Sequence, residues 1–339
     1  MIKNIDQLIV SLFEGFNPKQ QKVLTDRFGL KTGRRATLQE IGDELHVTRE
    51  RVRQIEEQGI KKIKTRIEEQ AGFLLDIAKE HLSRLGGVRE DSVFIGEILK
   101  KAGFQSGSKH SEAKVRFVLL VAGIPSYHKE DDSFLAFWYT DKKAEKKFFD
   151  FIKQMTQFLK NADRDKLFKE KTHLKQLSEV NTEHFLSIAK HFGVNIFGDF
   201  GLREWAEIEP KTVRDKAYLT LKKHGKPLHF EEIAKNIQRL GIDRRAAHVQ
   251  TVHNELIKDK RFVLVGRGIY ALSEHGYESG TVQQVIARLL KKQGPMNSEE
   301  VVRLVNEQRF LQKNTILLNL QNRKFFKRLD NGKYHVSEA

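Results

Sequence analysis

Four polar side chains near residue 50 are spaced so that they could bind the bases of a nucleic acid. Arg49, Glu50, Arg53 and Gln54 stand at positions i, i+1, i+4 and i+5, and a helix projects side chains at this spacing together from its first two turns. Arginine pairs with guanine, glutamine pairs with adenine, and glutamate accepts a hydrogen bond from the amino group of cytosine. We therefore predict that these four side chains read bases in a major groove.

Three lysines further along the same segment suit contacts with the phosphate backbone. They are Lys61, Lys62 and Lys64, with Arg66 beyond them. Phosphate contacts hold a protein in register on DNA without reading its sequence. The alternative is an ordinary solvated helix face, because alternating charges are common on helix surfaces.

The elements that must position these side chains can be read from capping residues between positions 17 and 64. The capping residues divide this range into three helices, and they are Asn17, Pro18, Gly29, Thr37, Glu40 and Thr48. Apolar residues at helical spacing give the third helix a core-facing side, which includes Val52, Ile55 and Ile63. Gly42 suits a close helix crossing. This pattern predicts a helix-turn-helix.

The motif Arg-Glu-Arg-Val-Arg-Gln-Ile-Glu at 49–56, with the segments 24–30 and 37–42, closely resembles region 4 of bacterial primary sigma factors. That region docks on the flap of RNA polymerase and reads the upstream, minus-thirty-five promoter element. The resemblance implies that Arg49, Glu50 and Gln54 read bases, and that Arg51 and Arg53 contact phosphates or nearby bases. We add Thr48, which caps the helix, to the expected phosphate contacts.

The resemblance covers about residues 17 to 66 and has two departures from the family. Gly59 stands where the family usually has alanine, which costs about 1 kcal/mol of helix propensity and predicts fraying or bending there. No counterpart of the sigma region that melts promoter DNA is found, because Trp138 and Trp205 lie alone in strand-like contexts. We therefore do not expect a free-standing sigma factor.

The last third of the chain contains two similar segments. Phe262 and Tyr270 align with Phe326 and Tyr334 at one offset, and each pair lies in a short hairpin that follows helical sequence. Hairpins after helices suggest winged helices, and the repetition predicts two tandem copies.

The first of these copies, about residues 210 to 273, resembles the HARE-type winged helix-turn-helix. That family is similar to the amino-terminal domain of the RNA polymerase delta subunit, and it occurs in chromatin and restriction proteins. Our candidates for phosphate contacts around its wing are Lys258, Lys260, Arg261 and Arg267. The alternative is that Lys260 and Arg261 only cap the hairpin.

We predict a mainly α fold, in which a sigma region 4-like helix-turn-helix precedes tandem winged-helix domains with small β-hairpin wings. The expected domains are 1–70 for the helix-turn-helix, 71–142 and 143–209 for two fainter winged helices, 210–275 for the HARE-type winged helix, and 279–338 for its repeat.

Charge is concentrated in the last third of the chain. The 339 residues carry 61 Lys and Arg against 45 Asp and Glu, a net charge of +16. Residues 211–339 hold 25 basic and 13 acidic side chains, which is +12 of that total. Such an excess favours a polyanionic partner, although a basic surface without a partner is also common.

The composition excludes several classes of chemistry. The absence of cysteine excludes disulfide frameworks and thiol nucleophiles. No apolar run is long enough for a membrane helix, and Asp6 argues against a signal peptide. The histidines, such as His248 and His253, lack the spacing of metal ligands. We therefore expect no enzyme, metal, cofactor, membrane contact or small-molecule substrate.

Together with these patterns, the resemblance to sigma region 4 implies a transcription factor that binds double-stranded DNA at bacterial promoters, with RNA polymerase core as a second partner through its flap. We expect a cytoplasmic, nucleoid-associated location. The alternative is a polymerase accessory subunit resembling delta, which acts mainly through protein contacts. A protein of a phage or mobile element that diverts the host polymerase is a third hypothesis.

Overall fold

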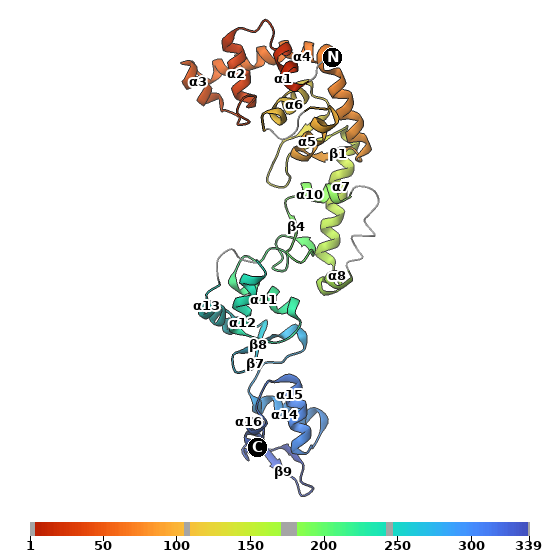
Figure 1. Cartoon of the computed structure of the whole chain (residues 1–339). Helices are drawn as coiled ribbons and strands as arrows, with labels where there is room; N and C mark the ends of the chain where they lie inside the picture. Colours follow the sequence, from red (N-terminus) through yellow and green to blue (C-terminus); the bar gives the residue numbers. More distant parts are fainter. Residues whose placement is uncertain (1–3, 105–108, 171–181, 242–246, 338–339) are drawn as a thin grey trace. The chain divides into compact units, whose positions relative to one another are not determined.

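The computed structural model describes residues 4–104, 109–170, 182–241 and 247–337, and the chain divides into two compact units, Met1–Phe192 and Gly193–Ala339. The first unit begins with the helices α1 (Ile5–Leu12), α2 (Pro18–Phe28), α3 (Leu38–Leu45) and α4 (Arg49–Arg84) (Figure 1). None of the helices in the described part of the chain combines the length and apolar character that crossing a lipid bilayer requires.

The capping signals predicted from the sequence form as expected. The side chain of Asn17 accepts a hydrogen bond from the N–H of Gln20, at 2.8 Å, and Gly29 ends α2 with a φ of 65°. Thr37 and Glu40 make both hydrogen bonds of a capping box. These contacts satisfy backbone donors at the helix starts that would otherwise lack partners.

Helix α4 extends much further than the helix-turn-helix motif requires. It is a single helix of 36 residues, and the division that we expect between residues 70 and 71 lies inside it. Its buried side follows one stripe, formed by Val52, Ile55, Gly59, Ile63, Ile67, Ala71, Leu74, Leu75, Ala78 and Leu82. The same helix therefore belongs to the motif and to the core that follows it.

That core is built from α4 together with a small sheet and two further helices. These are β1 (Val88–Glu90), α5 (Asp91–Lys101), α6 (Lys109–Ala122), β2 (Ser126–His128) and β3 (Phe137–Tyr139). The sheet is antiparallel, with the order β1-β3-β2. Leu8 of α1, Ile67 and Leu74 of α4, Phe94 of α5 and Phe117 of α6 are fully buried in one cluster.

The range 143–209 does not form one separate unit. Its elements are α7 (Lys142–Asn161), α8 (Arg164–Glu170), α10 (Thr182–Ile188), β4 (Phe192–Val194) and β5 (Phe200–Leu202), and the division between the two units falls after Phe192. Rings of α7 and α10 pack on the strand segment: Phe148 lies 4.9 Å from Phe137 and 5.4 Å from Phe185, between ring centroids. This aromatic cluster joins residues up to 192 to the first unit.

The second unit contains the two predicted winged helices in tandem. The first comprises α11 (Val213–His224), β6 (Leu228–His229), α12 (Phe230–Arg239), α13 (Val249–Lys258), β7 (Phe262–Gly266) and β8 (Ile269–Leu272). The second comprises α14 (Val282–Gln293), α15 (Ser298–Gln308), α16 (Lys313–Leu320), β9 (Phe326–Arg328) and β10 (Tyr334–Val336).

The aligned tyrosines occupy equivalent places in the two copies. Tyr270 pairs with Leu228 across β6 and β8, and Tyr334 forms a bridge with Met296. The predicted repeat and the predicted mainly α fold with hairpin wings are therefore confirmed. In the sheet of the first winged helix, with the order β6-β8-β7, the last strand in the chain lies in the middle. The sheet of the first unit, with the order β1-β3-β2, has the same arrangement.

A buried arginine connects the two winged helices of the second unit. Arg309 lies in the turn between α15 and α16 and is only 3% exposed. Its guanidinium donates hydrogen bonds to the carbonyl oxygens of Leu264, at 2.8 Å, and Glu278, at 2.6 Å. The N–H of Phe310 donates to the carbonyl of Val265 at 2.7 Å. Burial lowers the pKa of Arg309 from its usual value, yet three main-chain carbonyls, including that of Gly280, accept from its cationic side chain.

We predict fraying or bending at Gly59. The prediction of fraying is wrong, because α4 continues through this residue. A Cβ atom at this position would lie 2.7 Å from Cδ1 of Leu24, which is closer than carbon atoms pack. Leu24 itself is fully buried. Glycine is thus the residue that allows α2 and α4 to approach each other here.

We therefore expect Gly59→Ala to destabilise the protein despite its higher helix propensity. The gain of about 1 kcal/mol is outweighed by overpacking, which costs about 1–3 kcal/mol in a close-packed core. Gly72→Ala is the matched control, because a Cβ atom there meets nothing within 4 Å, and it should stabilise. Urea unfolding measures both, and equal stabilisation by the two alanines would contradict the packing role of Gly59.

A second prediction concerns Arg309. Replacement by methionine keeps the length of the side chain but leaves three carbonyls without their donor, so the free energy of unfolding should fall by about 2–4 kcal/mol. The control Arg303→Met removes an arginine whose side chain is 69% exposed and should change stability by less than about 0.5 kcal/mol. If both variants unfolded at the same urea concentration as the wild type, the hydrogen bonds of Arg309 would not stabilise the connection between the two winged helices.

Candidate nucleic-acid interface

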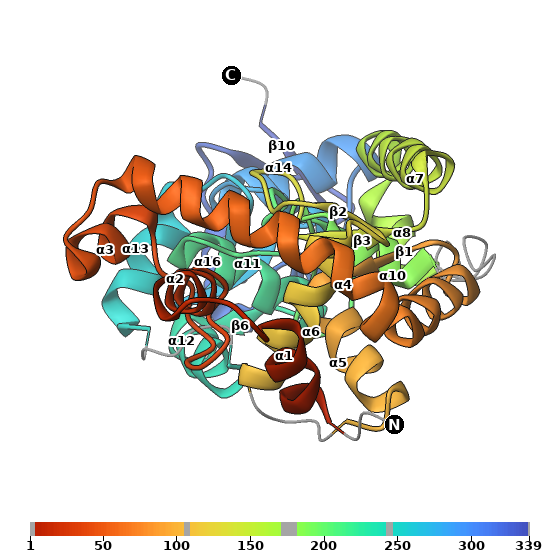
Figure 2. The ribbon, with the colours of Figure 1, turned by 90° about the horizontal axis from the view of Figure 1, so that it is seen from above.

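The turn between α3 and α4 sets the direction of the candidate reading helix. His46 adopts a left-handed conformation with a φ of 53°, and the hydroxyl of Thr48 accepts a hydrogen bond from the N–H of Arg51 at 3.2 Å. A Cβ atom on Gly42 would lie 2.8 Å from the carbonyl oxygen of Val47. The close approach expected at Gly42 therefore exists, and it is made with the backbone of the turn. Figure 2 shows α3 beside the first turns of α4.

A small core anchors the inner side of this motif. Val23 of α2, Ile41 of α3, and Val52 and Ile55 of α4 pack together, and Val52 is fully buried. Because these residues hold one side of α4 against α2 and α3, the opposite side faces outwards. All four predicted base-reading side chains, Arg49, Glu50, Arg53 and Gln54, are exposed there.

The exposed side chains are held in place by contacts with one another. Nη2 of Arg53 donates to Glu50 at 2.9 Å, and Nη1 donates to Glu57 at 3.3 Å. Arg51 donates to the side-chain oxygen of Gln54 at 3.1 Å. The hydrogen bond from Arg53 is the main reason that the pKa of Glu50 is lowered from its usual value. Glu50 is therefore a carboxylate at neutral pH, the form that accepts hydrogen bonds.

Within the described residues, the guanidinium of Arg49 makes no ion pair, so it is available to a ligand without exchanging a partner. To bind a base or a phosphate, Arg53 would have to release the carboxylates of Glu50 and Glu57. Both carboxylates around it are exposed, so water can take its place at them. Base reading by these residues remains a prediction.

The predicted phosphate contacts of α4 lie on its exposed surface. Lys61 lies 3.8 Å from a carboxylate oxygen of Glu57, Lys62 stands 5.7 Å from the ring centroid of Phe16, and Lys64 is exposed. Arg66 differs, because its guanidinium donates to the carbonyl of Leu12 at 3.0 Å. Arg66 thus ties the end of α1 to α4.

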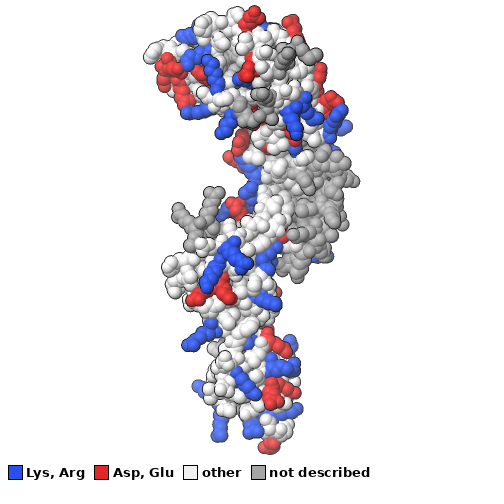
Figure 3. Space-filling view, in the orientation of Figure 1, with Lys and Arg blue, Asp and Glu red and all other residues white. Residues whose placement is uncertain are grey.

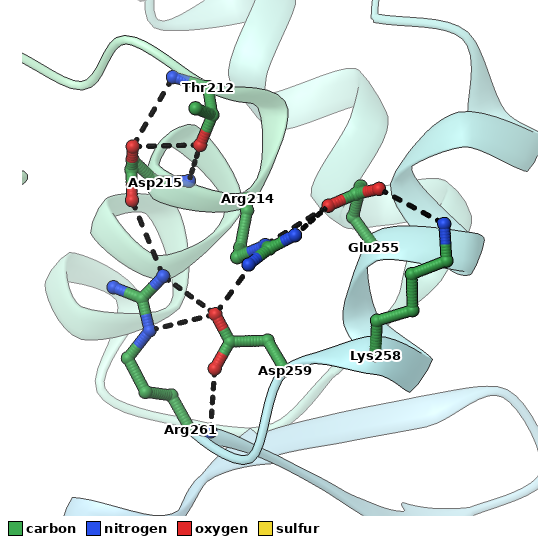
Figure 4. A network of polar contacts seen from close by, with 7 residues as sticks. All are labelled: Thr212, Arg214, Asp215, Glu255, Lys258, Asp259 and Arg261. Atoms are coloured by element: carbon green, nitrogen blue, oxygen red, sulfur yellow. Dashed lines mark hydrogen bonds and ion pairs between the residues drawn. The ribbon is translucent and has the colours of Figure 1, made fainter.

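The cations predicted around the HARE-type wing are divided between two environments. Lys260 and Arg267 are exposed. Arg261 instead pairs with Asp259 at 2.7 Å and with Asp215 at 3.3 Å, and Lys258 lies 3.6 Å from Glu255 (Figure 4).

This ion-pair network links α11, the end of α13 and the start of β7. Arg214 of α11 completes it through Glu255 at 2.7 Å and Asp259 at 3.6 Å. Burial alone would raise the pKa of Asp259, but hydrogen bonds from Arg261 and the nearby cations outweigh burial and lower it. The geometry is that of a structural brace, which agrees with the hairpin-capping alternative for Arg261. A phosphate role for Arg261 remains a prediction.

Sequence reasoning did not single out any cation of the last winged helix. Residues 313–336 include six exposed Lys and Arg side chains, which entered the sequence analysis only as part of the total charge. A signal was present in the density of basic residues between 323 and 333. Among the described residues, no group of three or more His, Asp or Glu is placed to hold a metal ion.

Comparison with known proteins identifies two segments of the chain. Residues 12–65 match the family model of sigma-70, region 4. Residues 211–275 match the model of the HARE helix-turn-helix domain, a family whose name refers to ASXL and restriction endonuclease proteins. Both families are DNA-binding domains rather than enzymes, so the matches support a DNA-binding, transcription-related role.

Curated relatives match the amino-terminal part of the chain. RNA polymerase sigma factor SigA of Clostridium acetobutylicum is 42% identical over 60 residues, which is 18% of this chain and 16% of SigA. RNA polymerase sigma factor RpoD of Neisseria gonorrhoeae is 36% identical over 76 residues, 22% of this chain and 12% of RpoD. The chain thus spans about a sixth or less of the relatives that it matches. Residues 12–65 form a sigma-70 region 4 domain, and residues 211–275 form a HARE helix-turn-helix domain.

Proposed function

We propose that this protein is a transcription factor whose α4 reads a promoter-like element in duplex DNA, and whose sigma region 4 domain also docks on RNA polymerase. The observation that carries the proposal is the exposed set Arg49, Glu50, Arg53 and Gln54 on the first two turns of a helix whose opposite side is buried. Recognition helices of helix-turn-helix proteins contact bases from this part of the helix.

The chemistry of the four side chains supports base reading rather than general attraction. Residues 1–70 hold 14 basic and 11 acidic side chains, so the domain has little net charge with which to bind DNA indiscriminately. An acidic residue on the reading face is unfavourable near phosphates, yet Glu50 suits the amino group of cytosine. Specificity would therefore come from Arg49, Glu50 and Gln54, and affinity from cations elsewhere.

The relatives support the polymerase part of the proposal. They are named RNA polymerase sigma factors, and the segment that they share with this chain includes the helix-turn-helix. We infer that the flap of RNA polymerase is a partner of this domain and that the target is a minus-thirty-five-like element.

We expect Arg49→Ala and Gln54→Ala each to reduce the preference of the full chain for minus-thirty-five-like duplex over scrambled duplex. A lost bidentate base contact costs about 1–3 kcal/mol, which is roughly a 5- to 150-fold loss of preference. Affinity for scrambled duplex should change little. Lys79→Ala, which removes an exposed cation from the far part of α4, is the matched control in fluorescence anisotropy. Equal binding of all duplexes by the wild type would rule out base reading.

A second candidate function is that of a polymerase accessory protein, similar to delta, that acts through protein contacts. The ion pairs of Arg214, Lys258 and Arg261 favour it, because these cations of the HARE domain are engaged within the protein.

The two candidates differ in their response to the flap segment of RNA polymerase without DNA. We expect the wild type and the Arg49→Ala/Gln54→Ala double variant to bind the isolated flap equally, since docking does not use the base-reading side chains. Surface plasmon resonance with and without promoter duplex measures this. Flap binding together with an absence of any DNA preference would favour the accessory function, and no flap binding would contradict the polymerase part of both.

A further inference from the structure

The carboxyl-terminal part of the last winged helix, from the start of α16 to β10, carries a group of cations without ion pairs in the described residues. Over residues 313–336 the chain has six basic side chains and one acidic side chain, Asp330. All six are exposed, and none forms an ion pair with a carboxylate in the described part of the chain: Lys313, Arg323, Lys324, Lys327, Arg328 and Lys333. Figure 3 shows Lys and Arg side chains at the end of the unit where β9 lies. We call these six residues the C-terminal basic face.

Part of the positive charge of the HARE domain is engaged in contacts within the protein. Its cations Arg214, Lys258 and Arg261 are paired with carboxylates, and Lys223 contacts the buried carboxylate of Asp199. A paired cation has much of its field cancelled at a distance, whereas an unpaired one attracts counterions. Lys260 and Arg267 of the HARE domain are exposed as well, but residues 313–336 offer a polyanion six exposed cations with a single carboxylate among them.

We propose that the C-terminal basic face binds duplex DNA and supplies the sequence-independent affinity of the protein. The start of α16 presents the exposed side chains of Lys313, Asn314 and Thr315. α15 and α16 form a helix-turn-helix, in which the second helix enters the major groove. The hairpin cations would then contact the flanking phosphates.

The composition of this face favours DNA over an acidic protein. Four of its six cations are lysines, which are depleted in protein interfaces. Protein–DNA interfaces are much more positively charged. Leu318 and Phe325 are the large apolar side chains exposed on the same elements, too few for the apolar core of a protein interface.

The face is also rigidly supported. Ile316 and Leu320 anchor α16 in the core of the last winged helix, and Phe326 anchors the hairpin there. The N–H of Tyr334 donates to the carbonyl of Met296 at 2.7 Å. Because Arg309 precedes α16 in the chain and is itself buried, the start of the helix is held as well. A preformed face loses little conformational entropy when it binds.

This inference rests on the proposed action on DNA, and its test uses duplex without a minus-thirty-five-like element so that base reading does not contribute. In the full chain we compare Lys324→Gln/Lys327→Gln with Lys235→Gln/Arg239→Gln, a control pair on the exposed side of α12 that removes the same charge. The salt dependence of affinity is measured by anisotropy. The slope of log affinity against log salt should fall by about 1.8 for the first pair, since each phosphate contact contributes about 0.9, and should not change for the control.

Equal slopes for the two pairs would overturn the inference, whether both fall or neither does. The inference would also be overturned if Lys324→Gln/Lys327→Gln weakened binding to polyglutamate but left the salt dependence of duplex binding unchanged. That result would assign the face to an acidic protein. The same comparison in the Arg49→Ala/Gln54→Ala background separates the two proposals. There, a retained slope difference supports the basic face even if promoter preference has failed in the wild type.

Discussion

The burial of one stripe of α4 is the constraint on which the amino-terminal unit depends. The stripe begins at Val52, within the helix-turn-helix, and continues to Leu82 in the core shared with α5 and α6. A rotation of α4 about its axis would expose apolar side chains along its whole length, at about 25 cal/mol for each Å². The outward direction of Arg49 and Gln54 is therefore determined by residues that lie up to about nine turns away.

Local features of this fold could be predicted from the sequence, because they depend on residues close together in the chain. The capping box of Thr37 and Glu40, the end of α2 at Gly29 and the hairpins of the second unit are of this kind. The length of α4 could not be predicted in this way, because the resemblance ends near residue 66 and the rest of the helix is held by packing against α5 and α6. The fit of Gly59 against Leu24 depends on two helices meeting, which periodicity does not report.

The same distinction applies to the candidate site. The type and spacing of Arg49, Glu50, Arg53 and Gln54 predict a common face, and the structure places all four on it. Composition does not show whether a cation is free. Arg261, for example, donates to Asp215, which lies 46 positions earlier in the chain. The buried role of Arg309 had no sequence signal either. Its acceptors are backbone carbonyls, which every residue carries.

The cations behind the net charge of +16 thus differ in their surroundings: some lie on the reading face, some brace the HARE domain, and six are exposed without an ion pair at the end of the last winged helix. In the proposed function, a domain that selects a DNA sequence is combined with a basic face that holds DNA. The most direct test of this function is genome-wide immunoprecipitation of the protein in its native cell, with and without an inhibitor of RNA polymerase. Sites at minus-thirty-five-like elements should persist when transcription stops. Loss of these sites together with the polymerase, or a signal that spreads over transcribed genes, would contradict it.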